Sequence, residues 1–260
     1  YGDFTAVDAL SFRVEAGQIM GLVGPNGAGK TTTLRCLAGI IPATLGHARI
    51  GGVDIAADPV AAKRQLAFIP DEPRLFEHLT VEQHLNFVAR LYGVADWQAR
   101  SQPLLDDLEM GDKRKLMPSE LSRGMKQKLA IACGLLHAPR AVILDEPLTG
   151  LDPHGIRRMK NTMRKLAGDG VAIILSSHLL DLVEEVCTHL LILKEGHKLA
   201  DGSVAEVRGD LARLVSCAEG RDPGPDRLAA GRHPQRRKSR RRQHDVRCVA
   251  PAASALPSHG

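Results

Sequence analysis

A glycine-rich loop that joins an apolar run to a helix-forming segment constrains this chain more than any other feature. The apolar run covers Ile19–Val23, and a helix is expected from Thr31 onward. Glycines let a backbone turn its N–H groups inward, and the N-terminus of a helix carries partial positive charge. The segment therefore predicts a cradle for phosphate oxygens. The cradle consists of Gly24, Pro25, Asn26, Gly27, Ala28, Gly29, Lys30, Thr31 and Thr32.

Two side chains of this loop indicate what kind of phosphate it holds. The spacing GxxxxGK[ST] ends in Lys30 and Thr31. At these positions a lysine reaches the β- and γ-phosphates of a nucleoside triphosphate, and a hydroxyl can ligate Mg²⁺. We therefore expect residues 24–32 to bind nucleotide, with Lys30 taking part in catalysis and Thr31 acting as a metal ligand.

Composition limits the class of protein and its compartment. The chain has 260 residues, of which 43% are hydrophobic, enough for one large domain or for a domain with a small appendage. Its five cysteines are scattered without CxxC spacing, which argues against a zinc site or a disulfide framework and favours the reducing cytoplasm. Every apolar stretch is much shorter than the roughly 18 residues that cross a bilayer.

Positive charge is concentrated in the last part of the chain. The formal net charge is +5, yet residues 209–260 hold 11 Lys/Arg against 5 Asp/Glu. Residues 1–208 are therefore nearly neutral, and no specific nucleic acid partner is expected. Residues 209–260 are rich in Pro, Gly and Arg without apolar periodicity, so we expect a disordered basic tail. It is either an arm for anionic lipid or RNA, or a C-terminus that replaces a normal ending.

The apolar pattern predicts an α/β fold with two kinds of strand. Val7–Val14 and Gln18–Val23 are expected to pair around a turn, and Ala48–Ile55 to form a second hairpin, together giving an antiparallel layer. Short apolar runs separated by helical patterns are typical of buried parallel strands. These runs are Leu66–Ile69, Ala141–Leu144, Val171–Leu175 and Leu190–Leu193.

A helical insert is predicted at about residues 77–137. Apolar residues recur at helical spacing over Thr80–Tyr92, Asp96–Leu108 and Ser122–Leu136. Thr80 is suited to cap the first of these helices at its start, and Gly93 is suited to cap it at its end.

Two carboxylates end one of the predicted parallel strands. Asp145 and Glu146 directly follow Val142–Leu144. Ligands of open α/β sheets bind at the carboxyl ends of the strands, so we expect both acids beside the phosphate loop. Asp145 is suited to hold Mg²⁺, and Glu146 is suited to polarise an attacking water.

A helix start lies upstream of this acidic strand. In Leu121–Met125, which reads LSRGM, Ser122 can cap the helix and Gly124 leaves its N–H group open to close approach. With the glycine loop before it and the acidic strand after it, this segment resembles the signature motif of the ATP-binding subunits of ABC transporters. The resemblance covers residues 1–208 and includes Gly150-Leu151-Asp152 at the D-loop, His178 at the switch histidine and Tyr1 at the adenine-stacking aromatic.

The resemblance implies a fold, an activity and partners. The fold is a P-loop NTPase (RecA-like) core with an antiparallel β layer and a helical subdomain that carries the signature. The activity is hydrolysis of ATP with Mg²⁺, which powers transport through a separate transmembrane permease subunit. The ATPase is then peripheral on the cytoplasmic face of the cell membrane, and the form LSRGM is similar to that of ABC-2 exporters.

The resemblance also implies how the residues work. Two ATPase subunits form a head-to-tail dimer, homomeric or heteromeric, in which Ser122 and Gly124 of one subunit meet the γ-phosphate held by the other. Glu146 orients water and His178 contacts the γ-phosphate, while Asp152 links the two sites.

Two motifs depart from the common pattern of the family, at three positions. Arg123 and Met125 stand where the signature usually has glycine and glutamine, and Asp71 stands where the Q-loop usually has glutamine. Asp71 can ligate Mg²⁺ through oxygen but cannot donate a hydrogen bond when ionised. The Q-loop segment and the helical insert together form the surface on which the coupling helix of the membrane subunit would press.

Two other functions stay open for a chain of this pattern. One is a nucleotide-binding regulatory subunit that scarcely hydrolyses ATP, and the other is a truncated, non-functional ATPase with an intact site but no dimer. Retention of Lys30, Asp145, Glu146 and His178 favours the catalytic interpretation.

Overall fold

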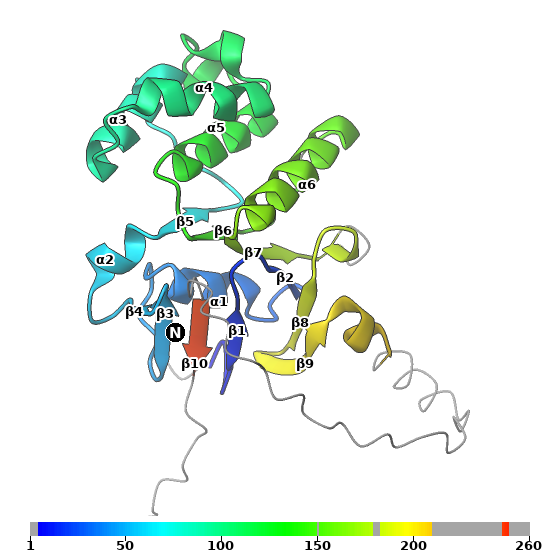
Figure 1. Ribbon diagram of the computed structural model, residues 1–260. Coiled ribbons are helices and arrows are strands. Elements are labelled where there is room, and N and C mark those ends of the chain that lie inside the picture. Colours follow the sequence, from blue (N-terminus) through cyan, green and yellow to red (C-terminus); the bar gives the residue numbers. More distant parts are fainter. Residues whose placement is uncertain (1–4, 150, 179–182, 210–245, 250–260) are drawn as a thin grey trace, which may run out of the picture.

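The described residues of the chain build two sheets separated by a helix. The computed structural model describes residues 5–149, 151–178, 183–209 and 246–249 (Figure 1). The larger sheet has the order β5-β6-β7-β2-β8-β9, in which β9 is antiparallel to β8 and the other neighbours are parallel. Its strands are β2 (Ile19–Val23), β5 (Leu66–Ile69), β6 (Ala141–Leu144), β7 (Ala172–Ser177), β8 (His189–Lys194) and β9 (His197–Ser203).

The parallel sheet is buried on both faces. Along β6, Val142 and Leu144 belong to the cluster under the helices α3 to α6, whereas Ala141 and Ile143 belong to the cluster on the opposite face. Successive strand residues point to opposite faces, so a strand covered on both sides must be apolar throughout. The four short apolar runs are confirmed as parallel strands of this sheet.

A smaller antiparallel sheet lies on the other side of the helix α1 (Lys30–Leu37). Leu34 and Leu37 of α1 are fully buried in one cluster with residues of both sheets, so α1 is packed between them. Figure 1 shows this sheet at the end of the molecule away from α3, α4 and α5. Its strands, in spatial order, are β1 (Phe12–Val14), β10 (Val246–Val249), β3 (His47–Ile50) and β4 (Val53–Asp54).

The predicted pairing of the first two strands is wrong. The strands β1 and β2 do not form a hairpin, because β1 pairs with β10 in the small sheet and β2 pairs with β7 and β8 in the large one. All five residues of β2 are buried, as a central strand requires, whereas β1 alternates buried and exposed positions. The second predicted hairpin is confirmed by the antiparallel pairing of β3 with β4.

The strand β10 lies within the segment for which disorder is expected. Its four residues pair with β1 on one side and with β3 on the other. Two of them are valines, which favour extended backbone, but the composition of the whole tail outweighs so short a signal. The rest of 209–260, apart from Gly209, lies outside the described residues.

The helices α3 (Val81–Tyr92), α4 (Trp97–Asp107) and α5 (Arg123–Leu135) occupy the predicted insert. Thr80 accepts a hydrogen bond from the Gln83 amide and Gly93 ends α3 with φ 71°, so both predicted caps are confirmed. No helix in the described part of the chain is long and apolar enough to span a bilayer. Further helical elements are α2 (Pro59–Lys63), α6 (Pro153–Gly168), the 3₁₀ turns Gly111–Lys113 and Pro118–Glu120, and a short helix at 204–209.

Candidate active site

The topology brings the predicted motifs to one edge of the large sheet. The strand β7 lies between β6 and β2, and all three run parallel. Leu144 is level with Leu175, and Val23 is level with Ser177, so the three strands end at the same edge. The glycine loop, the two acids and His178 follow these ends directly, where open α/β sheets bind ligands.

The glycine loop follows β2 closely and could not carry larger residues at its key positions. A Cβ atom at Gly24 would lie 2.3 Å from the carbonyl oxygen of Leu193 in the neighbouring strand β8. Gly29, with φ 96°, adopts the left-handed conformation just before α1 begins. Of the remaining loop residues, Pro25, Asn26 and Gly27 are exposed, Ala28 is buried, and Thr31 and Thr32 are partly buried.

Lys30 is a buried cation at the end of this loop, where α1 begins. Its side chain is only 7% exposed, and Nζ donates to the carbonyl oxygens of Gly24 at 2.7 Å and of Pro25 at 3.1 Å. Both acceptors are neutral, and a buried charge is costly unless an opposite charge compensates it. The loop therefore offers an ammonium group prepared for an anion.

Asp145 is held in place by two hydroxyl groups. Its Oδ1 accepts hydrogen bonds from Ser176 Oγ at 2.7 Å and from Thr31 Oγ1 at 3.3 Å. Ser176 Oγ in turn accepts from the backbone amide of Glu146 at 2.9 Å. The acid of β6, the hydroxyl of the glycine loop and the serine of β7 thus form one connected group.

Glu146 is paired with His178. The two side chains meet at 3.0 Å, between Oε2 of the glutamate and Nδ1 of the histidine. Glu146 has φ 48°, a left-handed conformation that costs a non-glycine residue of the order of 1–3 kcal/mol and is often retained at active sites. Two hydrogen bonds hold this turn in place. The Glu146 amide donates to Ser176 Oγ, and the Glu146 carbonyl accepts from the Thr149 amide at 3.1 Å.

Ser122 and Gly124 lie apart from this group. Ser122 caps α5 by accepting from the Met125 amide at 3.2 Å and is exposed. No hydrogen bond in the described residues joins Ser122 or Gly124 to the glycine loop. Their role toward the nucleotide stays a prediction.

The structure gives contacts for two further predicted site residues, Asp71 and Asp152, and does not describe a third, Tyr1. Asp71 forms an ion pair with Arg123 at 3.0 Å, and its metal role stays a prediction. Asp152 caps α6 by accepting from the Gly155 amide at 2.6 Å. Tyr1, like Gly150 of the D-loop, lies outside the described residues.

Sequence reasoning missed Ser176. The residue is fully buried and connects the two acids of β6, yet it stands within an apolar strand pattern. A hydroxyl at the end of a parallel strand, two residues before His178, is the signal that could have indicated it.

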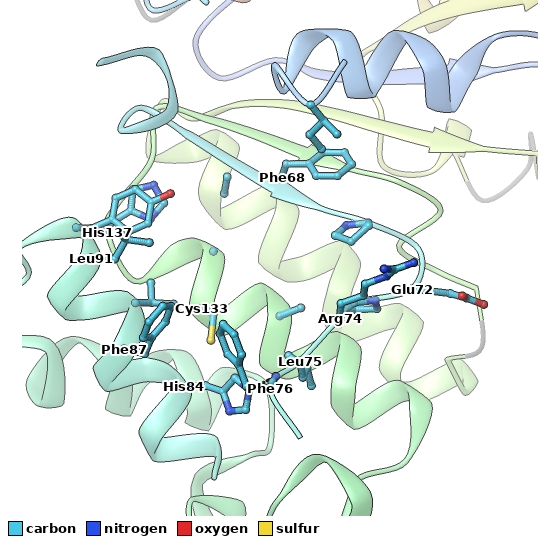
Figure 2. A pocket seen from close by; sticks show the side chains of 18 of the residues that line it. Phe68, Glu72, Arg74, Leu75, Phe76, His84, Phe87, Leu91, Cys133 and His137 are labelled. Carbon is cyan, nitrogen blue, oxygen red and sulfur yellow. Dashed lines mark hydrogen bonds between the residues drawn. The ribbon is translucent and has the colours of Figure 1, made fainter. Parts of the chain in front are cut away.

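An apolar groove opens beside the site, between the end of β5 and the helices α3 and α5. Its volume is about 640 Å³. Phe76 and Phe87 meet edge to face with centroids 5.1 Å apart, and Figure 2 shows them gathered with Cys133. His84 accepts from the Phe76 amide at 3.0 Å and pairs with the Thr80 carbonyl at 2.8 Å, which fixes the loop that carries Phe76.

Several of the apolar side chains that line the groove are exposed. Ile40 and Phe76 are each 54% exposed, and Leu91 is 64% exposed. Grouped exposure of this kind is typical of a surface that binds a partner.

Comparison with known proteins identifies the family. A family model described as ABC transporter matches residues 7–149. The chain is 37% identical over 201 residues to the ABC-type transporter ATP-binding protein EcsA of Bacillus subtilis (strain 168), covering 76% of this chain and 81% of that protein. It is 37% identical over 231 residues to the Nod factor export ATP-binding protein I of Paraburkholderia xenovorans (strain LB400), covering 88% and 75%.

Solved structures agree with this result. The ATP binding subunit of an ABC transporter matches with a TM-score of 0.78 and 34% identity, covering 82% of this chain and 89% of that chain. A nucleotide-free ATP-binding cassette from an ABC transporter has a TM-score of 0.72 at 22% identity, covering 84% and 94%, and so supports the fold. The chain therefore belongs to the ATP-binding subunits of the ABC transporter family, the ATPases whose hydrolysis of ATP powers transport.

Proposed function

We propose that the edge formed by β2, β6 and β7 binds ATP together with Mg²⁺ and hydrolyses it to drive export. The observation that carries this proposal is the hydrogen-bonded series from Thr31 through Asp145 and Ser176 to Glu146 and His178. It begins beside the buried ammonium of Lys30 and ends at the carboxylate of Glu146, so anion binding and water activation share one rigid edge.

The donor groups of this edge suit Mg²⁺. Thr31 offers a hydroxyl oxygen and Asp145 a carboxylate oxygen, and Mg²⁺ prefers oxygen ligands while keeping several waters and substrate phosphates around it. These two residues would hold the ion, directly or through its waters. Bound there, the ion would neutralise charge on the transferring phosphoryl group.

Glu146 is the proposed general base. Its carboxylate is mostly buried and lies at the carboxyl edge, where it can accept a proton from a water that attacks the γ-phosphate. His178, bonded to that carboxylate and about half exposed, can fix its orientation and contact the γ-phosphate. Lys30 stabilises the negative charge of the transition state.

The working unit is proposed to be a dimer. Ser122 is exposed and Gly124 is partly buried, and both lie at the start of α5, outside the hydrogen-bonded series of their own chain. The N-terminus of a helix attracts anions, so these residues can complete the nucleotide site of a second ATPase subunit, identical or different. Asp152 lies at the start of α6, where it can link the two subunits.

The apolar groove is proposed as the docking surface for a transmembrane permease subunit. Its exposed aromatic side chains can pack against the apolar face of a partner helix, and binding of a helix in a groove is a common mode of recognition. Docking there would hold the ATPase on the cytoplasmic face of the membrane. Export is proposed because relatives are named for Nod factor export and, at 32% identity over 209 residues, for linearmycin resistance in Bacillus subtilis (strain 168).

The test compares the wild-type chain with Glu146→Gln. We expect ATP turnover in the wild type and a loss of at least a hundredfold in the variant, with the variant eluting as an ATP-held dimer from gel filtration in Mg²⁺. The matched control is Glu77→Gln, an exposed change away from the edge, which should turn over normally. A wild type that binds ATP without turnover or dimer would contradict the proposal and favour a regulatory or truncated subunit.

A further inference from the structure

Two of the three positions that depart from the family pattern meet in space. Asp71 follows β5, and Arg123 is the first residue of α5, 52 residues further along the chain. Arg123 Nη2 donates to Asp71 Oδ1 at 3.0 Å. The side chains are 40% and 55% exposed, so the pair lies at the surface.

Each end of this ion pair is attached to one half of the proposed composite site. Asp71 stands two residues after Ile69, whose carbonyl accepts from the Asp145 amide at 2.9 Å. The Asp71 end is therefore fixed to the strand edge that carries the acids. Arg123 directly follows Ser122, the cap of α5.

A second contact joins the same two segments. Gln127 is buried one turn further along α5, and its Nε2 donates to the carbonyl oxygen of Pro70 at 3.4 Å. Residues four apart lie on the same face of a helix. Arg123 and Gln127 thus place one face of α5 against the residues that directly follow β5.

We propose that Asp71 and Arg123 are a positioning pair that sets where Ser122 and Gly124 lie relative to the edge formed by β2, β6 and β7, called the nucleotide edge from here on for its proposed function. The proposal rests on the proposed function, because it concerns the geometry of that composite site. Asp71 then serves the reaction through its partner on α5 and not as a metal ligand. The two departures from the family pattern compensate each other, since the guanidinium supplies the donor groups that an ionised aspartate lacks.

The exposure of the pair limits the size of its effect. Exposed ion pairs shift an equilibrium by about two- to fivefold and are weakened by salt. The pair therefore biases the position of α5 without locking it. A contact of this strength can open and close in each catalytic cycle.

The test is a charge-exchange cycle measured by ATP turnover. We expect Asp71→Asn and Arg123→Gln each to lower kcat about threefold, leaving ATP affinity and the half-saturating Mg²⁺ concentration unchanged. Exchanging the charges, with Asp71→Arg and Arg123→Asp in one chain, should restore most of kcat. The control Arg100→Gln breaks an exposed ion pair of 2.9 Å between Arg100 on α4 and Asp96, the residue before that helix, and should leave kcat unchanged.

Three outcomes would overturn the proposal. A raised Mg²⁺ requirement in Asp71→Asn alone would make Asp71 a metal ligand. Equal kcat in all variants, or effects that simply add in the exchanged chain, would show that the pair does not act as a unit.

A failure of the proposed function gives a different result from a failure of the pair. If the wild type does not turn over, the proposed function fails, and the pair is then tested by hydrogen exchange of the backbone amides at 123–126. Each single variant should exchange faster there, and the charge-exchanged chain should exchange as the wild type does. If hydrogen exchange at these amides is unchanged in the single variants, the proposal that the pair positions α5 is overturned.

Discussion

The nucleotide edge and the apolar groove are built in opposite ways. At the edge, polar groups are buried and bonded to one another, as Lys30 and Asp145 show. In the groove, apolar groups are exposed, as Phe76 and Leu91 show. Both regions adjoin the carboxyl end of the same sheet, and the groove begins at β5.

The difference fits the roles proposed for the two regions, catalysis at the edge and docking in the groove. Chemistry needs reacting groups held within a fraction of an ångström, and buried hydrogen bonds supply that rigidity. Docking needs surface that gains free energy when covered, about 25 cal/mol for each Å² of apolar area. The comparison predicts that changes at the edge alter turnover and that changes in the groove alter attachment.

The largest expected effect is that of Lys30→Ala. Removing the buried ammonium should lower kcat for ATP by about a hundred- to a thousandfold, because the transition state loses a fixed positive charge. The measurement is phosphate release at saturating ATP, with Lys63→Ala, an exposed lysine at the end of α2, as control. A loss of kcat of less than threefold would contradict the contrast between edge and groove, because a change at the edge would then affect turnover as little as a change in the groove.

Ser176→Ala should have an intermediate effect. The change leaves the Glu146 amide without its hydroxyl partner and Asp145 with one hydroxyl donor fewer, at a cost of about 1–3 kcal/mol in stability and about tenfold in kcat. Ser101→Ala is the matched control, because Ser101 is also buried and bonds the Gln98 carbonyl in α4. Urea unfolding and turnover are measured on both, and equal losses of kcat would contradict the assignment of Ser176.

The smallest effect on the isolated chain is expected from Leu91→Ser. Turnover should stay within about twofold and stability within about 0.5 kcal/mol, because the side chain is 64% exposed. Attachment to membranes that carry the permease subunit should weaken about fivefold, measured by co-sedimentation. Leu199→Ser on β9, at 61% exposure, is the control outside the groove. Equal weakening by both changes would show that the groove is not a specific surface.

Much of the nucleotide edge could be predicted from the sequence because its signals are local. The glycine loop and the acids after β6 each depend on neighbours within a few residues, and the same is true of the caps of α3 in the helical insert. Parallel order then brings the local motifs together without further information, since strands of one sheet end at one edge.

The features that were mistaken or missed depend on contacts between distant residues. The strands β1 and β2 are adjacent in sequence, but burial on both faces places β2 at the centre of the large sheet. The pairing of Asp71 with Arg123 and the role of Ser176 likewise arise only when separate elements meet. The sequence around each of these residues carries no pattern that specifies its distant partner.

The position of β10 has a consequence for the order in which the molecule can be assembled. Residues 246–249 form the strand between β1 and β3. Both of these neighbours lie within the first 50 residues of the chain and are synthesised early. All the strands of the parallel sheet lie within residues 19–203. On a ribosome, that sheet and its nucleotide loop can form while the facing edges of β1 and β3 are still unpaired. The small sheet can close only after residues 246–249 have been synthesised, through contacts separated by about 200 residues, and such distant contacts form slowly.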